Sequence, residues 1–326
     1  MLINFFRSNQ TLALFVVPVI VGLLCLRVFV MPFHVETVEY MMPFYQWALA
    51  LLGFGTVMPI ITLFVLLMFQ TYFINNILSQ NEVLNKKNNL LLLILPLLST
   101  ALPQFISFGP MLFVNTLLVV VFSKMLSLYK SNNPLPLVFD AGLLIALSSL
   151  FYFPAISLLL FLFICLFIIR PFSWREWAVV LMGFSAPYFL ISLYYFWNDK
   201  LIYFYTELLP MCMGRGFTFG TTISGTTWAI FSLLALIFIL ALLKIQSNYY
   251  KTAVRGRNYI QALFILLFVA SLSLIVAPHK TVSSLQILVL PLSVMLAFYF
   301  IHVKRLFMAE LLLYALIATI VFNQYM

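Results

Sequence analysis

The chain has 326 residues, of which 65% are hydrophobic and 8% are charged, with a formal net charge of +9. A soluble domain carries about 25% charged residues, so this composition excludes a soluble fold, whose polar exterior would be too small to cover so much apolar surface. The positive charge is spread over many short loops and forms no basic face, which argues against nucleic-acid binding.

Apolar runs recur along the whole chain, and no stretch between them is long enough for a soluble domain. The N-terminus resembles a signal peptide, but its run is longer than a typical h-region and has no cleavage pattern, so we expect an uncleaved first span. The sequence predicts an all-α, polytopic bundle that forms one integral membrane domain over residues 1–326. Its eleven expected spans are 11–31, 45–68, 89–104, 109–127, 137–152, 154–169, 176–197, 223–243, 258–276, 283–302 and 306–323.

The distribution of Lys and Arg predicts the orientation of these spans. With a cytoplasmic N-terminus, thirteen of the seventeen basic residues fall in inside segments and four fall outside, namely Arg27, Lys200, Arg215 and Lys280. This asymmetry is what the positive-inside rule requires. The C-terminus is then outside, and the chain is expected in a bacterial inner membrane.

Two regions fit eleven full spans poorly, because 89–127 and 137–169 must each hold two helices. Both are interrupted by proline, at Pro96, Pro103 and Pro110 in the first and at Pro154 in the second. Full hairpins and re-entrant segments both remain open, and broken helices at matching places sometimes mark a binding site. Ordinary short helices in a tilted bundle are the simpler interpretation.

The segment Arg170–Trp177 combines Trp and Arg in the way that is typical of an anchor at the membrane interface. We expect a short surface turn in which Ser173 caps the following helix. Cys25 and Cys165 lie in apolar runs and Cys212 lies in a loop, so this odd, scattered set predicts neither a disulfide framework nor a zinc site.

Ionisable residues at membrane depth are candidates for function. Asp140 and Glu310 each lie about one turn inside an expected span, near its cytoplasmic end. An ion pair with a nearby Lys or Arg is the simplest interpretation of both. Neither acid is near mid-membrane, where a proton or ion pathway would place it.

The predicted outer face holds more candidate chemistry. Glu36 and Glu39 are candidate catalytic bases in the first outer loop, since a carboxylate tuned by its neighbours can act as a general base. Candidate substrate-binding residues lie in the same loop and in two later outer loops, and a Gly-rich turn around Arg215 is of a kind that can bind phosphate. These binding candidates are His34, Asp199, Lys200, Arg215, His279 and Lys280.

The stretch from Phe139-Asp140-Ala141-Gly142 through Arg170–Trp177 to Trp197-Asn198-Asp199 resembles an uncharacterised family of bacterial multi-pass inner-membrane proteins. The layout also resembles, more remotely, the membrane glycosyltransferases that use polyprenyl-phosphate sugars. That second resemblance implies that an acid of the first outer loop, Glu36 or Glu39, serves as the base. The first outer loop is shorter here than in those enzymes, and there is no large outer domain.

Three functions therefore remain open. The chain is a glycosyltransferase-like enzyme acting on a polyprenyl-phosphate-linked substrate, a non-catalytic membrane subunit of an envelope assembly or secretion complex with protein partners, or a transporter or lipid flippase. The sequence carries no motif for a nucleotide, a metal or a flavin, so no cofactor is expected, and membrane lipids are the expected surroundings.

Overall fold

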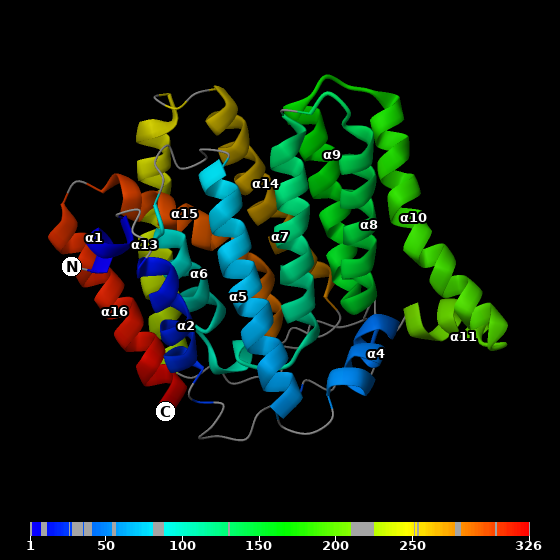
Figure 1. Cartoon of the computed structure of the whole chain (residues 1–326), viewed down its shortest axis with the longest axis horizontal. Helices are drawn as coiled ribbons and strands as arrows, with labels where there is room; N and C mark the ends of the chain where they lie inside the picture. Colours follow the sequence, from blue (N-terminus) through cyan, green and yellow to red (C-terminus); the bar gives the residue numbers. More distant parts are fainter. Residues whose placement is uncertain are drawn as a thin grey trace.

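A computed structural model describes residues 2–7, 12–25, 27, 35, 41–53, 57–80, 88–129, 131–209, 225–250, 252, 254–277, 282–303 and 305–325. Over these residues the chain is a bundle of helices with no strand (Figure 1). Seven of the helices are long and apolar enough to cross a membrane, and four shorter apolar helices accompany them. Each of the eleven predicted segments overlaps one of these apolar helices, and seven of the helices reach spanning length. The all-α prediction is confirmed.

The helices follow the chain with short connections. In order they are α1 (Leu2–Arg7), α2 (Leu12–Leu24), α4 (Pro43–Leu52), α5 (Val57–Gln80), α6 (Leu90–Ser99), η1 (Pro103–Phe105), α7 (Pro110–Leu128), α8 (Leu135–Phe151), η2 (Phe153–Ser157), α9 (Leu158–Ile169), α10 (Trp174–Trp197), α11 (Leu201–Tyr203), η3 (Phe204–Leu208), α13 (Gly225–Tyr249), α14 (Val254–Val276), η4 (Val282–Leu288), α15 (Val289–His302) and α16 (Leu306–Tyr325).

The predicted span 45–68 is wrong in its bounds. This region forms two helices, because α4 ends at Leu52 with Gly53 as its C-cap and α5 begins only at Val57. The short α4 packs against α8. The hydroxyl of Tyr45 in α4 donates to the carbonyl of Phe108 at 2.9 Å, which holds α4 against the connection before α7.

The proline-interrupted region 89–127 contains one helix of full length. Helix α6 has ten residues, about 15 Å, which is half of a ~30 Å hydrocarbon layer. Pro103 opens the 3-10 turn η1 and Pro110 opens α7, as expected where the missing N–H of proline is tolerated at a helix start. The predicted span 89–104 is therefore a half-length helix followed by a turn.

The second interrupted region, 137–169, forms two antiparallel helical segments, α8 and a second one made of the turn η2 with α9. Helix α8 has 17 residues, about 25 Å, and Pro154 lies in the 3-10 turn η2 that leads into α9. Figure 1 shows α7, α8 and α9 side by side. The hairpin interpretation of this region agrees with the fold.

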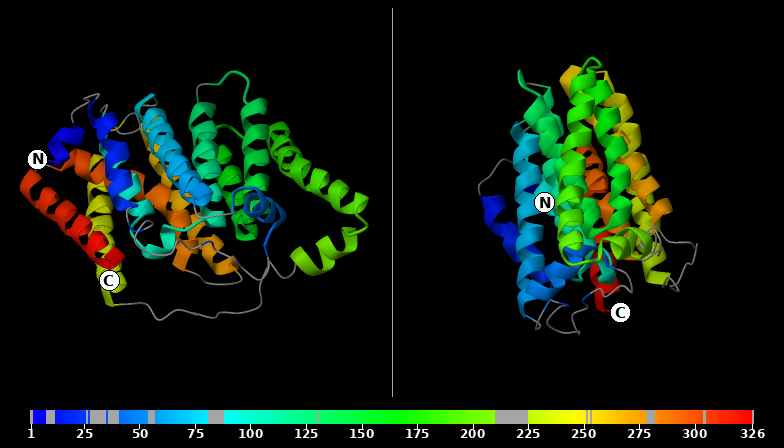
Figure 2. Two further views of the ribbon diagram at one scale, coloured as in Figure 1. Left: turned by 60° about the horizontal axis from the view of Figure 1, so that its bottom comes forward. Right: turned by 90° about the vertical axis from the view of Figure 1, so that its right-hand side faces the viewer.

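The core lies around α15 and α6. Most residues of the segment Val282–His302 are buried, and every residue of α6 is buried. Helix α15 packs against α6, α13 and α14. At the two sides of the bundle, α16 lies on one flank while α10 and α11 form a V that extends from the other (Figures 1 and 2).

The connections α7–α8, α9–α10 and α13–α14 lie at one end of the bundle, which we call the basic end (top of Figure 1). Described basic residues in or beside these connections are Lys124, Arg170, Arg175, Lys244 and Arg257. Lys200 lies at the opposite end, after α10. These five cations thus lie at one end of the bundle and Lys200 at the other, as the sequence predicted for these residues.

The interfacial segment Arg170–Trp177 forms the expected turn, and Ser173 is the N-cap residue of α10, as predicted. The side chain of Ser173 makes no capping hydrogen bond. Its carbonyl accepts the backbone N–H of Glu176 at 3.1 Å, and the Glu176 carboxylate lies 3.8 Å from Nε of Arg170. An acid in the first turn of α10 suits the positive end of the helix dipole.

Candidate functional site

An apolar groove lies in the half of the bundle away from the basic end. It has a volume of about 390 Å³, within the range of roughly 300–1,000 Å³ that small-molecule sites occupy. Every residue lining it is apolar; these are Leu98, Ala101, Leu102, Phe105, Ile230, Phe231, Leu234, Ala235, Phe238, Leu285, Leu288, Val289 and Leu292. We refer to it below as the apolar groove.

Three pieces of chain form the walls of this groove. The end of α6 with η1 forms one wall, the first half of α13 forms the second, and η4 with the start of α15 forms the third. In α13 the lining residues recur every three to four positions, so they lie on one helical face. At the level of the groove α6 ends at Ser99, and the 3-10 segment η4 leads into α15.

Buried amide side chains hold the discontinuous segments together beside the groove. Nδ2 of Asn115 in α7 donates to the carbonyl of Gln286 in η4 at 2.9 Å. Nε2 of Gln286 lies 3.4 Å from the carbonyl of Phe105 in η1, whose side chain lines the groove. These side chains bond backbone groups that helix breaks leave without helical partners, which would otherwise cost free energy in an apolar layer.

A second polar contact supports the other side of the groove. Nε2 of Gln324 in α16 donates to the carbonyl of Thr100 at 2.8 Å, one residue before the lining residue Ala101. The hydroxyl of Thr226, one turn before Ile230, bonds Oδ1 of Asn323. Asn115 and Asn323 are both 5% exposed. Their remaining atoms, Oδ1 of Asn115 and Nδ2 of Asn323, have no partner in the described structure.

Most of the predicted site residues lie outside the described part of the chain. These are the candidate bases Glu36 and Glu39 and the binding candidates His34, Arg215, His279 and Lys280. Their predicted convergence remains a prediction. In the chain, His279 and Lys280 lie shortly before η4, which begins at Val282, and Arg215 belongs to the segment that precedes α13.

Asp199 and Lys200, two further binding candidates, are described, and they terminate α10. Asp199 has φ of 54°, the left-handed region, and its N–H donates to the carbonyl of Phe196 at 3.1 Å. The N–H of Lys200 donates to the carbonyl of Tyr195 at 2.9 Å. This is the Schellman pattern of a helix C-terminus. Both residues therefore have a structural role at the α10–α11 turn, and the exposed Lys200 side chain lies at the end of the bundle away from the basic end.

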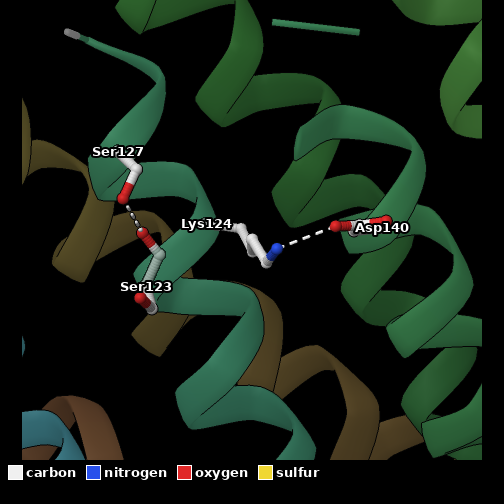
Figure 3. A network of polar contacts seen from close by, with 4 residues as sticks. All are labelled: Ser123, Lys124, Ser127 and Asp140. Carbon is white, nitrogen blue, oxygen red and sulfur yellow. Dashed lines mark hydrogen bonds and ion pairs between the residues drawn. The ribbon is translucent and has the colours of Figure 1, made fainter. Parts of the chain in front are cut away.

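Asp140 forms the ion pair that was its simplest interpretation. Its Oδ2 lies 2.7 Å from Nζ of Lys124, which joins α8 to α7 (Figure 3). The two side chains are 44% and 31% exposed. Glu310 lies in α16, on the opposite flank of the bundle from α8 (Figure 1), so the fold does not bring the two intramembrane acids together.

The amides beside the groove were missed by sequence reasoning that considered only ionisable groups. A signal was present, because Asn115 and Gln286 are single amides inside otherwise apolar runs. Among the residues that the structure describes, no group of His, Cys, Asp and Glu is arranged to hold a metal ion. The apolar lining of the groove suits it to binding an apolar group.

Comparisons with protein-family models, curated proteins and solved structures find no match to this chain. The class of protein rests on the fold itself. An apolar helical bundle with seven helices of membrane-spanning length is compatible with a multi-pass membrane protein.

Proposed function

We propose that this protein is a glycosyltransferase-like enzyme of the bacterial inner membrane that acts on a polyprenyl-phosphate-linked substrate. The proposal rests on the apolar groove. Its lining residues are all apolar, although the amide side chains of Asn115 and Gln286 lie beside it. Such a lining favours a hydrocarbon chain over a sugar or an ion, because a polar ligand buried there would lose its hydrogen bonds.

The orientation that we propose places the groove in the outer half of the bilayer. With the basic end in the cytoplasm, the groove lies in the half of the bundle that faces outward. A polyprenyl chain bound there would carry its phosphate toward the outer surface. The segments that lead into two walls of the groove contain Arg215 and Lys280, the proposed phosphate-binding cations.

The chemistry in this proposal belongs to the first outer loop. Glu36 or Glu39 would act as the general base that removes a proton from the acceptor hydroxyl, as the architectural resemblance implies. The hydroxyl oxygen then attacks the anomeric carbon of the sugar, and the polyprenyl phosphate leaves with the electrons of the broken C–O bond. A positioned base contributes typically 10²–10⁴-fold to rate.

A substitution that fills the groove tests the binding of the polyprenyl chain separately from the catalytic step. Ala235 lines the groove on α13, whereas Ala229 is an exposed residue of the same helix that does not line it. Ala235→Trp should weaken the binding of a polyprenyl phosphate at least about tenfold by occupying the space of the chain. Ala229→Trp makes the same change outside the groove and should bind like the wild type.

A transfer assay with polyprenyl-phosphate sugars then tests the catalytic step. Glu36→Gln and Glu39→Gln should retain polyprenyl phosphate binding, and the variant that lacks the base should lose turnover by at least about 100-fold. Equal binding by Ala235→Trp and Ala229→Trp would contradict the groove assignment. Full turnover in both glutamine variants would contradict the proposed bases.

A further inference from the structure

A second cavity lies at the other end of α13, where α13 packs against the end of α15 and the start of α16. It has a volume of about 510 Å³. Its floor is apolar, formed by Leu240, Leu243, Val303, Met308 and Leu312. Its polar lining comes from Lys244, Arg305, Ser247 and Tyr299. We call it the basic pocket.

The charge of the basic pocket is not neutralised within the described chain. No acidic residue lines it, and neither Lys244 nor Arg305 forms an ion pair with a described residue. Glu310 lies two residues from both Met308 and Leu312, which is about 200° around the helix, so it belongs to another face of α16. Two cations and two hydroxyl groups therefore share one cavity with room for an anion.

Both cations lie near helix ends, where a spanning helix would reach a membrane surface. Lys244 is five residues from the end of α13, and Arg305 directly precedes α16. The N-terminus of α16 adds the positive end of a 20-residue helix dipole beside Arg305. The leucines and methionine of the floor continue from this level toward the bundle interior, along the direction that acyl chains take.

We propose that the basic pocket binds an anionic phospholipid, with its phosphate held by Lys244 and Arg305 and its acyl chains lying over Leu240, Leu243 and Leu312. Basic pockets between transmembrane helices are a known means of holding such headgroups. A free phosphate ion would satisfy the two cations equally well, but it would leave the apolar floor uncovered. The floor is the reason for assigning a lipid.

The test is native mass spectrometry of the full-length protein titrated with phosphatidylglycerol or with phosphatidylcholine. Each basic residue near an anionic lipid surface changes the binding affinity by on the order of tenfold or less. The double variant Lys244→Gln/Arg305→Gln, which loses two such residues, should therefore bind phosphatidylglycerol roughly 30-fold more weakly. Arg175→Gln is the matched control, because Arg175 is an exposed cation of the basic end that does not line the pocket. Lys244→Arg/Arg305→Lys keeps both charges and should retain binding.

Three results would overturn the proposal. The first is equal binding of phosphatidylglycerol by the wild type and the glutamine double variant. The second is equal binding of phosphatidylglycerol and phosphatidylcholine by the wild type. The third is competition by millimolar inorganic phosphate, which would show a site for the free anion. A glutamine variant that misfolds is recognised by its elution in gel filtration, and the wild type's preference for phosphatidylglycerol over phosphatidylcholine, measured with and without inorganic phosphate, then carries the test.

Discussion

Gly142 of α8 and Gly183 of α10 each lie against the backbone of the other helix. A Cβ atom on Gly142 would be 2.5 Å from the carbonyl oxygen of Val180, and one on Gly183 would meet the carbonyl oxygen of Phe139. The two glycines thus allow α8 and α10 to approach closely, as small residues do at helix contacts in membranes. This contact attaches α10, which diverges toward α11, to the bundle.

Alanine at either glycine should therefore destabilise the α8–α10 contact. We expect Gly142→Ala and Gly183→Ala each to lower the free energy of unfolding by about 1–3 kcal/mol, because the helices must separate. Gly22 in α2 has no atom within 4 Å of its added Cβ and is the control. Thermal unfolding in lipid nanodiscs measures the effect, and an unchanged midpoint in both α8–α10 variants would refute the close contact.

The Lys124–Asp140 ion pair should make only a modest contribution to stability. Because both side chains are about a third or more exposed, solvent screens the pair, and Asp140→Asn should cost about 1 kcal/mol or less. The exchanged double variant Lys124→Asp/Asp140→Lys should recover most of the loss. A double-mutant cycle in denaturant gives the coupling directly, and a coupling well above that value would point to a role beyond local pairing.

Local composition was sufficient to predict the apolar segments and the breaks at Pro103, Pro110 and Pro154, since hydropathy and the missing N–H of proline act locally. The break predicted at Pro96 was wrong, because Pro96 lies inside α6. The division between α4 and α5 was not predicted, because both helices lie in one apolar run that is interrupted by only a few residues from Gly53 to Thr56. Nor was the Asn115–Gln286 contact, whose partners are 171 residues apart. A contact of that separation leaves no local pattern, although the lone amides were visible.

Asp199 provides a way to separate structure from substrate binding. Because its φ of 54° is unfavourable for a residue with a Cβ atom, Asp199→Gly should stabilise the protein by up to about 1 kcal/mol. Asp199→Val, with a branched side chain in the same conformation, should destabilise it by about 1–2 kcal/mol. Thermal unfolding of both variants tests this, and loss of polyprenyl phosphate binding in a stable Asp199→Gly variant would restore Asp199 as a ligand-binding residue.

The proposed orientation can be tested with the cysteines of the chain. Cys25 and Cys165 are buried, at 5% and 0% exposure, so neither should react with a maleimide in the folded protein. Cys212 lies in a predicted outer loop and should react with a membrane-impermeant maleimide in intact cells. Cys212→Ser should remove this labelling and provides the background for a second probe at the basic end.

That second probe is Asn133→Cys in the Cys212→Ser background, at an exposed position between α7 and α8. If the basic end is cytoplasmic, its thiol should react only after the membrane is permeabilised. The reverse pattern, with Asn133→Cys labelled in intact cells and Cys212 protected, would invert the bundle. The apolar groove would then lie in the inner half of the bilayer and the basic pocket in the outer half. This measurement therefore decides from which leaflet each of the two sites takes its lipid.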